Sequence, residues 1–525
     1  MQLICYISNA HYMIALETLP ENVRQHILDQ ESELARRAHI IQLQQEEIKL
    51  LNLRFFGPKS EKLSPTQTAW LFEEPGLTTA EVQKEAERPE TEKTAPLPRA
   101  KVPRRNNPGR EKLPDHLERR VVTIPCHPKD CRCERCGAER PVIGYETHEE
   151  LGMEPAKFFI KEVRREKRGS HCLPEQGVAT APAPARITPK GKLADEFIIE
   201  VLARKYQQHL PIYRQCAILA EDHDLELSRA TLTNAVLAAG ELLRAVVRAQ
   251  AVELKKSDYL QADETTVPVQ PEERTGSNHT GFWWQYSQPG GPVVFDFQMG
   301  RGRVGPEAFL KGFRGVLQCD GYDAYDKLGE GIVYAGCMSH ARRGFVDLAK
   351  VAPLDPRPVE ILGRFHELYE VERKSRAAQE TVAQRLARRQ TQSVPVMAAL
   401  KTRLVELRQE SIPGCKLAKA CDYVLGQWSR LEVYLSNGLI EIDNNWCEGG
   451  MRPLVLGRKN WLHLGSKEAG PKVAAIASII ETCRRLDLNL RDYLTDILPK
   501  LGDWPIHRIG ELTPTAWKAA QAKKV

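Results

Sequence analysis

The stretch Leu260-Gln-Ala-Asp-Glu-Thr-Thr-Val-Pro-Val269 decides the fold, because its β-branched and apolar residues predict a strand with a carboxylate at its centre. Two more segments of strand composition follow, Gly281-Phe-Trp-Trp-Gln-Tyr286 and Val293-Val-Phe-Asp-Phe297. The turn-forming cluster Gln288-Pro-Gly-Gly-Pro292 separates them. The three segments therefore predict a three-stranded antiparallel meander.

A short helix and a fourth strand are expected after the meander. Pro306–Phe313 has the composition of the helix, and Gly315-Val-Leu-Gln-Cys-Asp320 that of a strand ending in a second carboxylate. Three antiparallel strands, a helix and another strand form the opening of an RNase H-like sheet. In that arrangement an Asp on the first strand and an Asp ending the fourth lie side by side. We expect a multidomain α/β protein with an RNase H-like catalytic core.

A third carboxylate is expected from Ile442-Asp-Asn-Asn-Trp-Cys-Glu-Gly-Gly-Met-Arg452. Asp443 precedes a predicted helix and suits its N-cap, whereas Glu448 lies within the helix. Glu448 is therefore favoured as the ligand over Asp443 and Glu441. Hard oxygen ligands from strands and a helix suit a pair of Mg²⁺ ions that drive in-line attack at a phosphodiester.

Two alternatives to this site stay open on spacing alone. A single Asp near a strand end is more often a turn or cap residue than a ligand. Glu264 also competes with Asp263, because successive strand residues face opposite sides of a sheet. The pattern nevertheless favours a polynucleotidyl transferase.

Five strings resemble the transposases of the insertion-sequence-66 family, which are DDE enzymes. They are Ala262-Asp-Glu-Thr-Thr-Val267, Gln318-Cys-Asp-Gly-Tyr322, His340-Ala-Arg-Arg343, Ile442-Asp-Asn-Asn445 and Gly457-Arg-Lys-Asn-Trp461. The resemblance runs from about Ala15 to Leu501 and implies that Asp263, Asp320 and Glu448 are catalytic and bind Mg²⁺ or Mn²⁺. It thereby selects Asp263 over Glu264.

The resemblance also implies a reaction and its partners. A DDE transposase performs metal-dependent DNA cleavage and strand transfer at the ends of an insertion sequence. Its partners would be transposon ends, target DNA and possible accessory proteins of the same element. One alternative is an RNase H-like nuclease without strand transfer. The other is a catalytically inactive DNA-binding protein of the same fold.

The N-terminal residues 15–63 are expected to form a zipper-like segment. Within them Glu21–Leu53 predicts a long helix with an apolar residue every seventh position, at Ile27, Leu34, Ile41 and Ile48. The second heptad position that should be apolar in a coiled coil is instead occupied by Gln30, Arg37 and Gln44, so the apolar pattern is incomplete. The pattern fits either a two-stranded coiled coil, and hence a homo-oligomer, or a helix docked on its own chain.

Residues 64–118 have the composition of a disordered linker. Its Pro- and Arg-rich end, which contains Arg104 and Arg105, could lie along a DNA groove. A solvated linker is an equal alternative.

Residues 119–178 predict a zinc-binding module. Cys133-Glu-Arg-Cys136 has the pair spacing of structural Zn²⁺ sites, and Cys172 is a third expected ligand. The fourth ligand is left open among His171, Cys131 and Cys126. Related proteins end the module with a second Cys-x-x-Cys pair, and Ser170 stands near the place of its first Cys. Phe158–Val163 is expected to be a strand within this module.

Residues 186–250 are expected to be helical, with helices over Leu193–Leu219 and Leu225–Leu243. Ser228 is a good N-cap, so Arg229 would open a recognition helix of the helix-turn-helix kind. Many helical hairpins that do not bind DNA have the same pattern.

The catalytic core is divided by an insertion. Its first part spans residues 255–349, the helical insertion 350–436, the second part 437–505, and a C-terminal tail 506–525. The insertion could contact DNA or a second protomer, or it could be a packed helical subdomain. The cations expected to bind phosphate near the site are Arg342, Arg343, Arg458 and Lys459. A solvated basic turn is the alternative for Arg458 and Lys459.

Composition is compatible with a DNA-binding protein. The 525 residues carry a net charge of +6, which is mildly basic and weak evidence by itself. No apolar run approaches membrane-spanning length, and Met1–Leu19 lacks the pattern of a secretory signal. The 13 Cys are scattered as in reduced proteins. We expect a cytoplasmic, nucleoid-associated protein without a membrane partner.

Overall fold

A computed structural model describes residues 2–7, 10–15, 20–56, 158–161, 163, 167–169, 178–180, 185–189, 191–271 and 277–523. Contacts divide the chain into one unit of residues 1–93 and 165–525 and a smaller unit of residues 94–164. The predicted zinc ligands Cys133, Cys136, His171 and Cys172 and the basic arm with Arg104 and Arg105 lie outside the described residues.

The N-terminal segment contains a hairpin and one long helix. Strands β1 (Gln2–Ile7) and β2 (Ala10–Ala15) pair antiparallel, and α1 spans Glu21–Phe56. The predicted long helix is therefore confirmed. Its heptad residues Leu34 and Ile41 are exposed. The coiled coil that would cover them stays a prediction.

The region of the expected zinc module contributes one small strand pair. Strand β3 (Lys167–Gly169) pairs antiparallel with β4 (Val178–Thr180). Phe158–Lys161 and Val163 have no regular structure, so the strand predicted over Phe158–Val163 is wrong for these residues. Their apolar side chains are largely exposed, so little burial favours a strand at these residues.

The centre of the protein is a five-stranded mixed sheet in the order β7-β6-β5-β8-β9. Strands β5, β6 and β7 form the predicted antiparallel meander, and β8 and β9 run parallel to β5. Sequence patterning did not predict β9. The strands are β5 (Tyr259–Val269), β6 (His279–Ser287), β7 (Val293–Gln298), β8 (Gly315–Gln318) and β9 (Ile332–Ala335).

Both faces of the sheet are covered. On one face Trp283 of β6 meets Trp461 of helix α13 (Asn445–Trp461), with ring centroids 5.9 Å apart. On the other face Tyr286 stacks on Phe309 of helix α6 (Val304–Leu310) at 3.8 Å. We call the first of these the α13 face. Because side chains alternate along a strand, every second residue of β5 belongs to it.

A group of helices lies directly before the sheet in the chain. They are α3 (Asp195–Tyr206), α4 (Ile212–His223) and α5 (Arg229–Leu254). One helix was predicted over Leu193–Leu219, but the chain breaks it at His209, whose φ is +59°, and at Pro211, which caps α4. Helix α5 is long and apolar enough to cross a membrane by composition, yet its apolar residues pack into the core against α14 and α3.

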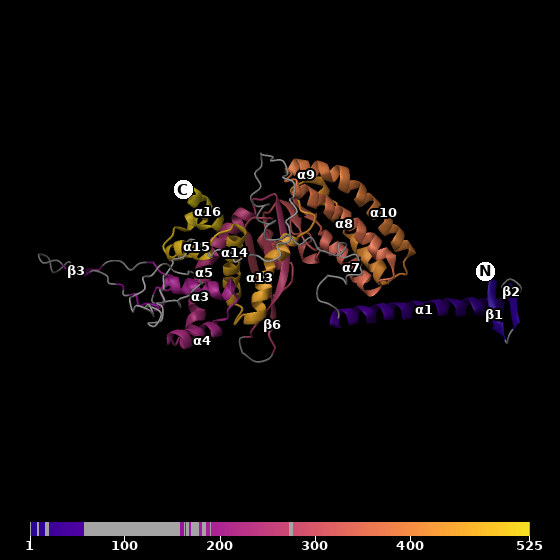
Figure 1. Cartoon of the computed structure of the whole chain (residues 1–525), viewed down its shortest axis with the longest axis horizontal. Coiled ribbons are helices and arrows are strands. Elements are labelled where there is room, and N and C mark those ends of the chain that lie inside the picture. The colour runs from indigo at the N-terminus through magenta and orange to yellow at the C-terminus, as the bar shows by residue number, and fades with distance from the viewer. Residues whose placement is uncertain are drawn as a thin grey trace, which may run out of the picture. The chain divides into compact units, whose positions relative to one another are not determined.

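A helical insertion separates β9 from α13, and its helices cluster together in Figure 1. They bury a second hydrophobic core that also contains Tyr259 of β5 and Ala335 of β9. This agrees with the prediction of a packed helical subdomain. The elements are α7 (Met338–Val351), α8 (Pro356–Ala377), α9 (Val382–Arg388), the π-helical turn η5 (Arg389–Ser393), α10 (Val394–Glu410), α11 (Lys416–Gly426), α12 (Trp428–Leu431) and η6 (Val433–Ser436).

The C-terminal helices complete the main core. Helix α14 (Ala469–Arg485) packs on both α5 and β7, where Thr482 Oγ1 accepts a 2.9 Å hydrogen bond from the Gln250 amide. Helices α15 (Leu490–Ile497) and α16 (Pro514–Ala522) follow.

Candidate active site

The three predicted carboxylates come from three different elements. Asp263 lies on β5, Asp320 follows the end of β8 by two residues, and Glu448 lies in the first turn of α13. Burial raises the pKa of Asp263 well above its usual range, and the negative charges of Glu448, Glu264 and Asp320 raise it further. These carboxylates therefore lie close enough for their charges to act on Asp263, and we call Asp263, Asp320 and Glu448 the carboxylate cluster.

Backbone amides contact two of these carboxylates, and basic side chains of helix α7 approach the third. Asp263 Oδ1 accepts from the Glu264 amide at 2.8 Å, and Asp320 Oδ1 accepts from the Tyr322 amide at 2.9 Å. Beside Glu448, two basic groups of α7 approach its Oε1. His340 Nε2 lies at 3.7 Å and Arg343 Nη2 at 4.0 Å.

The structure separates Asp263 from its competitor Glu264. Asp263 is paired across strands with Gln285, on the α13 face, whereas Glu264 is paired with Trp284 on the opposite face. There Glu264 accepts from Arg301 Nη2 at 2.6 Å and from the Tyr325 hydroxyl at 3.0 Å. Glu264 is therefore already engaged by two donors, although burial raises its pKa as well.

Sequence reasoning missed Arg301. Its guanidinium lies 3.9 Å from the ring centroid of Tyr322 while it pairs with Glu264, so it adds a positive charge beside the carboxylate cluster. Met299-Gly-Arg-Gly-Arg303, a basic turn directly after β7, was the available signal.

The donor set fits a divalent cation chemically. Carboxylate oxygens are the ligands that Mg²⁺ and Mn²⁺ prefer. Burial and, secondly, the neighbouring carboxylates raise the pKa of Asp263, and a bound cation would lower it. Among the described residues, no group of three or more His, Cys, Asp or Glu side chains is placed so that it could hold a metal ion.

The N-terminus of α13 is held by Asp443, although the N-cap position itself falls on Asn444. Asp443 Oδ1 accepts from the Asn445 amide at 3.1 Å, and Oδ2 accepts from the Tyr369 hydroxyl at 2.9 Å. The prediction that Asp443 is the N-cap is therefore wrong by one residue, although its side chain still accepts a hydrogen bond from the first turn of the helix. Burial raises the pKa of Asp443 to about 6.

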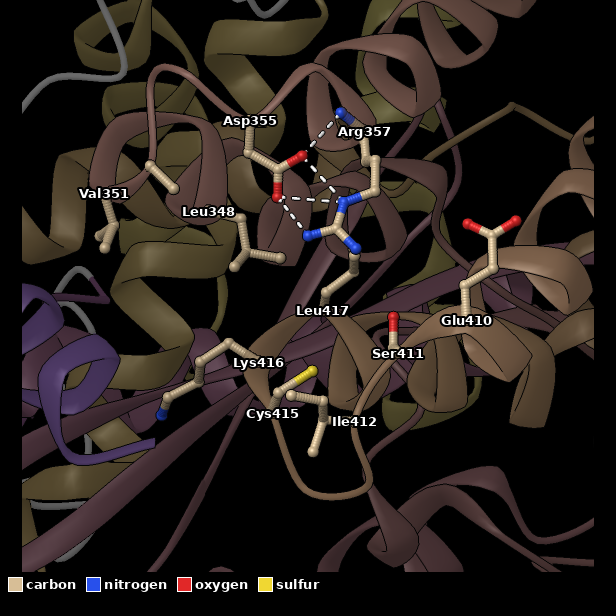
Figure 2. A pocket seen from close by; sticks show the side chains of 11 residues that line it. Leu348, Val351, Asp355, Arg357, Glu410, Ser411, Ile412, Cys415, Lys416 and Leu417 are labelled. Atoms are coloured by element: carbon tan, nitrogen blue, oxygen red, sulfur yellow. Dashed lines mark hydrogen bonds and ion pairs between the residues drawn. The ribbon is translucent and has the colours of Figure 1, made fainter. Parts of the chain in front are cut away.

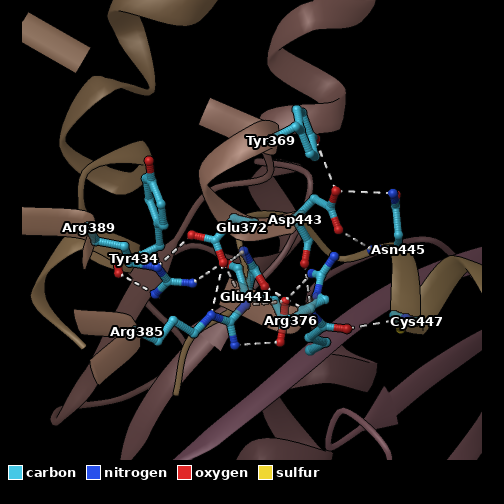
Figure 3. A network of polar contacts seen from close by, with 12 residues as sticks. Tyr369, Glu372, Arg376, Arg385, Arg389, Tyr434, Glu441, Asp443, Asn445 and Cys447 are labelled. Carbon is cyan, nitrogen blue, oxygen red and sulfur yellow. Dashed lines mark hydrogen bonds and ion pairs between the residues drawn. The ribbon is translucent and has the colours of Figure 1, made fainter. Parts of the chain in front are cut away.

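A buried ion-pair network lies directly before α13, at Glu441 (Figure 3). Arg385 donates to both oxygens of Glu441, at 2.9 and 2.7 Å, and Arg376 donates to Oε2 at 2.7 Å. Glu372 accepts from Arg385 and from Arg389. Although burial alone would raise it, the charges of Arg385 and Arg376 hold the pKa of Glu441 well below its usual range. These ion pairs therefore connect the helical insertion to the segment that leads into α13, the helix that carries Glu448.

The cations expected to bind phosphate differ in accessibility. Arg343 and Lys459 are exposed, and Arg458 donates to the carbonyl and hydroxyl oxygens of Thr266. Arg342 is only 4% exposed, which argues against the predicted phosphate contact, because a buried guanidinium cannot reach an external phosphate.

Arg229 is exposed in the first turn of α5. The predicted N-cap before it is confirmed, because Ser228 Oγ accepts from the Thr231 amide at 3.1 Å.

A small cavity of about 180 Å³ lies elsewhere, where the end of α7 meets α8 and the junction of α10 and α11 (Figure 2). Among the charged residues that line it, Asp355 and Arg357 pair with each other at 2.8 Å. None of the three clustered carboxylates lines it.

Comparison with known proteins gives matches along most of the chain. The model described as "Transposase IS66 family" matches residues 190–472, "Transposase C of IS166 homeodomain" matches 43–122, and "IS66 C-terminal element" matches 478–515. Two uncharacterized proteins of Sinorhizobium fredii (strain NBRC 101917 / NGR234) are similar over long stretches. One, y4jD, is 31% identical over 96% of this chain and 98% of its own length. The other, y4hP, is 30% identical over 80% and 79%.

Proposed function

Because the chain belongs to the IS66 family of transposases, we propose that it is a DDE transposase, which cleaves DNA at the ends of an insertion sequence and joins them to target DNA. The observation that supports this proposal is that the charges of Asp320, which follows β8, and of Glu448 on α13 both act on Asp263 of β5. We further propose that the mixed sheet is RNase H-like. The order of its strands, with β8 parallel and adjacent to β5, supports this.

The proposed ligands are the three carboxylates, and the proposed ions are Mg²⁺ or Mn²⁺. Two such ions would activate the attacking oxygen and stabilise the leaving oxygen of a phosphodiester. The protein's own contribution is to hold the carboxylates in place through the Glu264 and Tyr322 amides. Arg343, which is exposed beside Glu448, would bind a DNA phosphate.

The proposal extends to the other predicted parts of the chain. Arg229, Arg458 and Lys459 would contact DNA, with α5 opening as a recognition helix. Helix α1 would pair with its copy in a second protomer through the exposed heptad residues. A zinc site in residues 119–178 and the Arg104–Arg105 arm are proposed from sequence alone.

The test is a cleavage assay with a labelled duplex that carries the DNA flanking the gene, in Mg²⁺ or Mn²⁺ and with chelator as a blank. Asp263→Asn, Asp320→Asn and Glu448→Gln should each abolish nicking while DNA binding is kept, because the loss is confined to metal ligands. Asp323→Asn is the matched control, since this exposed carboxylate lies three residues after Asp320. It should cleave as the wild type does.

The outcomes separate the candidate functions. Wild-type cleavage by Asp320→Asn would refute the site. Metal-dependent nicking without joining to target DNA would support the nuclease alternative. Specific binding by the wild type without any nicking would support the inactive DNA-binding protein.

A further inference from the structure

The sequence places a glutamine two residues before each strand carboxylate. β5 contains Gln261-Ala-Asp263, and β8 leads into Gln318-Cys-Asp320. The two glutamines are direct partners in the parallel pairing of these strands, and both side chains are fully buried. Two buried amides side by side are costly unless each of their polar atoms is hydrogen-bonded.

Both amides are bonded to the backbone that leads into α13. Gln261 Nε2 donates to the carbonyl of Asp443 at 2.8 Å, and its Oε1 accepts from the amide of Cys447 at 3.2 Å. Gln318 Nε2 donates to the carbonyl of Glu441 at 2.9 Å. The pair thus bonds to residues 441–447, and the next residue in the chain is Glu448.

Tyr259 completes the group on the same strand. Its hydroxyl accepts from the Glu441 amide at 3.1 Å and donates to Gln318 Oε1. Gln261 Nε2 also lies 2.9 Å from Gln318 Oε1, so the three side chains form one connected unit. We call Tyr259, Gln261 and Gln318 the glutamine clamp.

The clamp adds an acceptor at the start of α13. Asn444, at the N-cap, makes no side-chain capping bond, whereas the Asp443 carboxylate accepts from the Asn445 amide. The Cys447 amide donates to the Asn444 carbonyl at 2.8 Å and also to Gln261 Oε1, on a sheet strand, at 3.2 Å. The start of α13 is therefore hydrogen-bonded to β5, which contains Asp263, and the segment just before it is hydrogen-bonded to β8, which leads into Asp320.

We propose that the glutamine clamp positions Glu448 relative to Asp263 and Asp320. The clamp residues are positioning residues, because they act through the backbone of residues 441–447 and touch none of the reacting atoms. This inference rests on the proposed function, in which the three carboxylates bind divalent ions together. Glutamine suits the task because one side chain both donates and accepts.

The test compares Gln261→Met and Gln318→Met with Gln250→Met in the full chain. Methionine keeps the length of glutamine and removes its hydrogen bonds. Gln250 is the matched control, because it is also buried and its amide donates to Val293 O and Thr482 Oγ1, away from α13. Two measurements are made on each protein, backbone hydrogen exchange over residues 439–448 and Mn²⁺ affinity.

Both clamp variants should exchange about tenfold faster over residues 439–448, as expected for the loss of buried hydrogen bonds. They should bind Mn²⁺ roughly 10–100-fold more weakly, as is typical when groups supporting metal ligands are removed. Gln250→Met should change neither quantity. The cleavage defect of the clamp variants should be smaller than that of Glu448→Gln.

Unchanged exchange over residues 439–448 would overturn the clamp. Faster exchange with wild-type Mn²⁺ affinity would overturn its positioning role and leave it a structural contact. A wild-type chain that binds no Mn²⁺ would refute the carboxylate site itself. That failure is distinguishable, because the exchange difference between Gln261→Met and Gln250→Met would persist.

Discussion

Arg385→Met should be among the most destabilising single changes in the helical insertion. The Arg385 side chain is 4% exposed and donates to two carboxylates, Glu441 and Glu372, which are 4% and 1% exposed. Methionine fills a similar volume but leaves both carboxylates without one of their cations. The segment before α13 then loses its main anchor to the insertion.

The magnitude follows from burial. Removing one partner of a buried ion pair costs about 3–5 kcal/mol, because the remaining charge stays desolvated. Arg376 still pairs with Glu441 and Arg389 with Glu372, so we expect a loss of about 3 kcal/mol, at the lower end of that range.

The assay is urea unfolding followed by circular dichroism, with Arg388→Met as the matched control. Arg388 also pairs with a glutamate, Glu380, but their side chains are 25% and 14% exposed. A pair of this kind contributes about 0–1 kcal/mol. A loss for Arg385→Met no larger than that for Arg388→Met would refute the argument from burial.

Two further predictions concern pH and salt. The Asp443 carboxyl faces Tyr369, Arg376, Glu441 and Asn445, and its pKa in the folded state is raised to about 6. Between about pH 4 and pH 6 the folded state therefore keeps a proton that the unfolded state has released. The free energy of unfolding should fall as the pH rises through this range. Asp443→Asn should flatten this dependence, which is worth about 2 kcal/mol between pH 4.5 and pH 7, where unfolding is measured. An unchanged pH profile would contradict the assignment. Arg343→Gln should reduce the slope of log affinity for DNA against log salt by about 0.9, because one phosphate contact is lost. The buried Arg342, changed to Gln, should leave the slope unaltered, and equal slopes for Arg343→Gln and wild type would rule out that contact.

The sequence predicted the sheet better than the helices around it. The β-branched, aromatic segments of β5, β6 and β7 are bounded by turn residues, and their antiparallel pairing follows from that pattern. β9 was missed because its four residues, Ile332–Ala335, are too short to show a period. The break between α3 and α4 was missed because His209 adopts a positive φ that composition does not announce.

The carboxylates of the candidate site could be found from the sequence, but the residues that hold the surrounding segments in place could not. Asp263, Asp320 and Glu448 stand in recognisable strings. The choice of Asp263 over Glu264 came from the family resemblance, and the register of β5 against β6 gives it a physical basis. The sequence does not distinguish Arg342 from its neighbour Arg343. Only the packing of α7 shows that Arg342 is buried and Arg343 is exposed. The clamp and the ion-pair network join residues far apart in the chain, so spacing could not reveal them.

The long insertion between β9 and α13 also has a consequence for the time course of synthesis. Glu448 leaves the ribosome roughly 185 residues after Asp263, a delay of roughly 10–40 s at about 5–20 residues per second. Helix α14, which covers α5 and β7, comes later still. Helices α3 to α5 therefore emerge well before the carboxylate set can be completed. A chain terminated early within the insertion would keep those helices and lack the third carboxylate altogether.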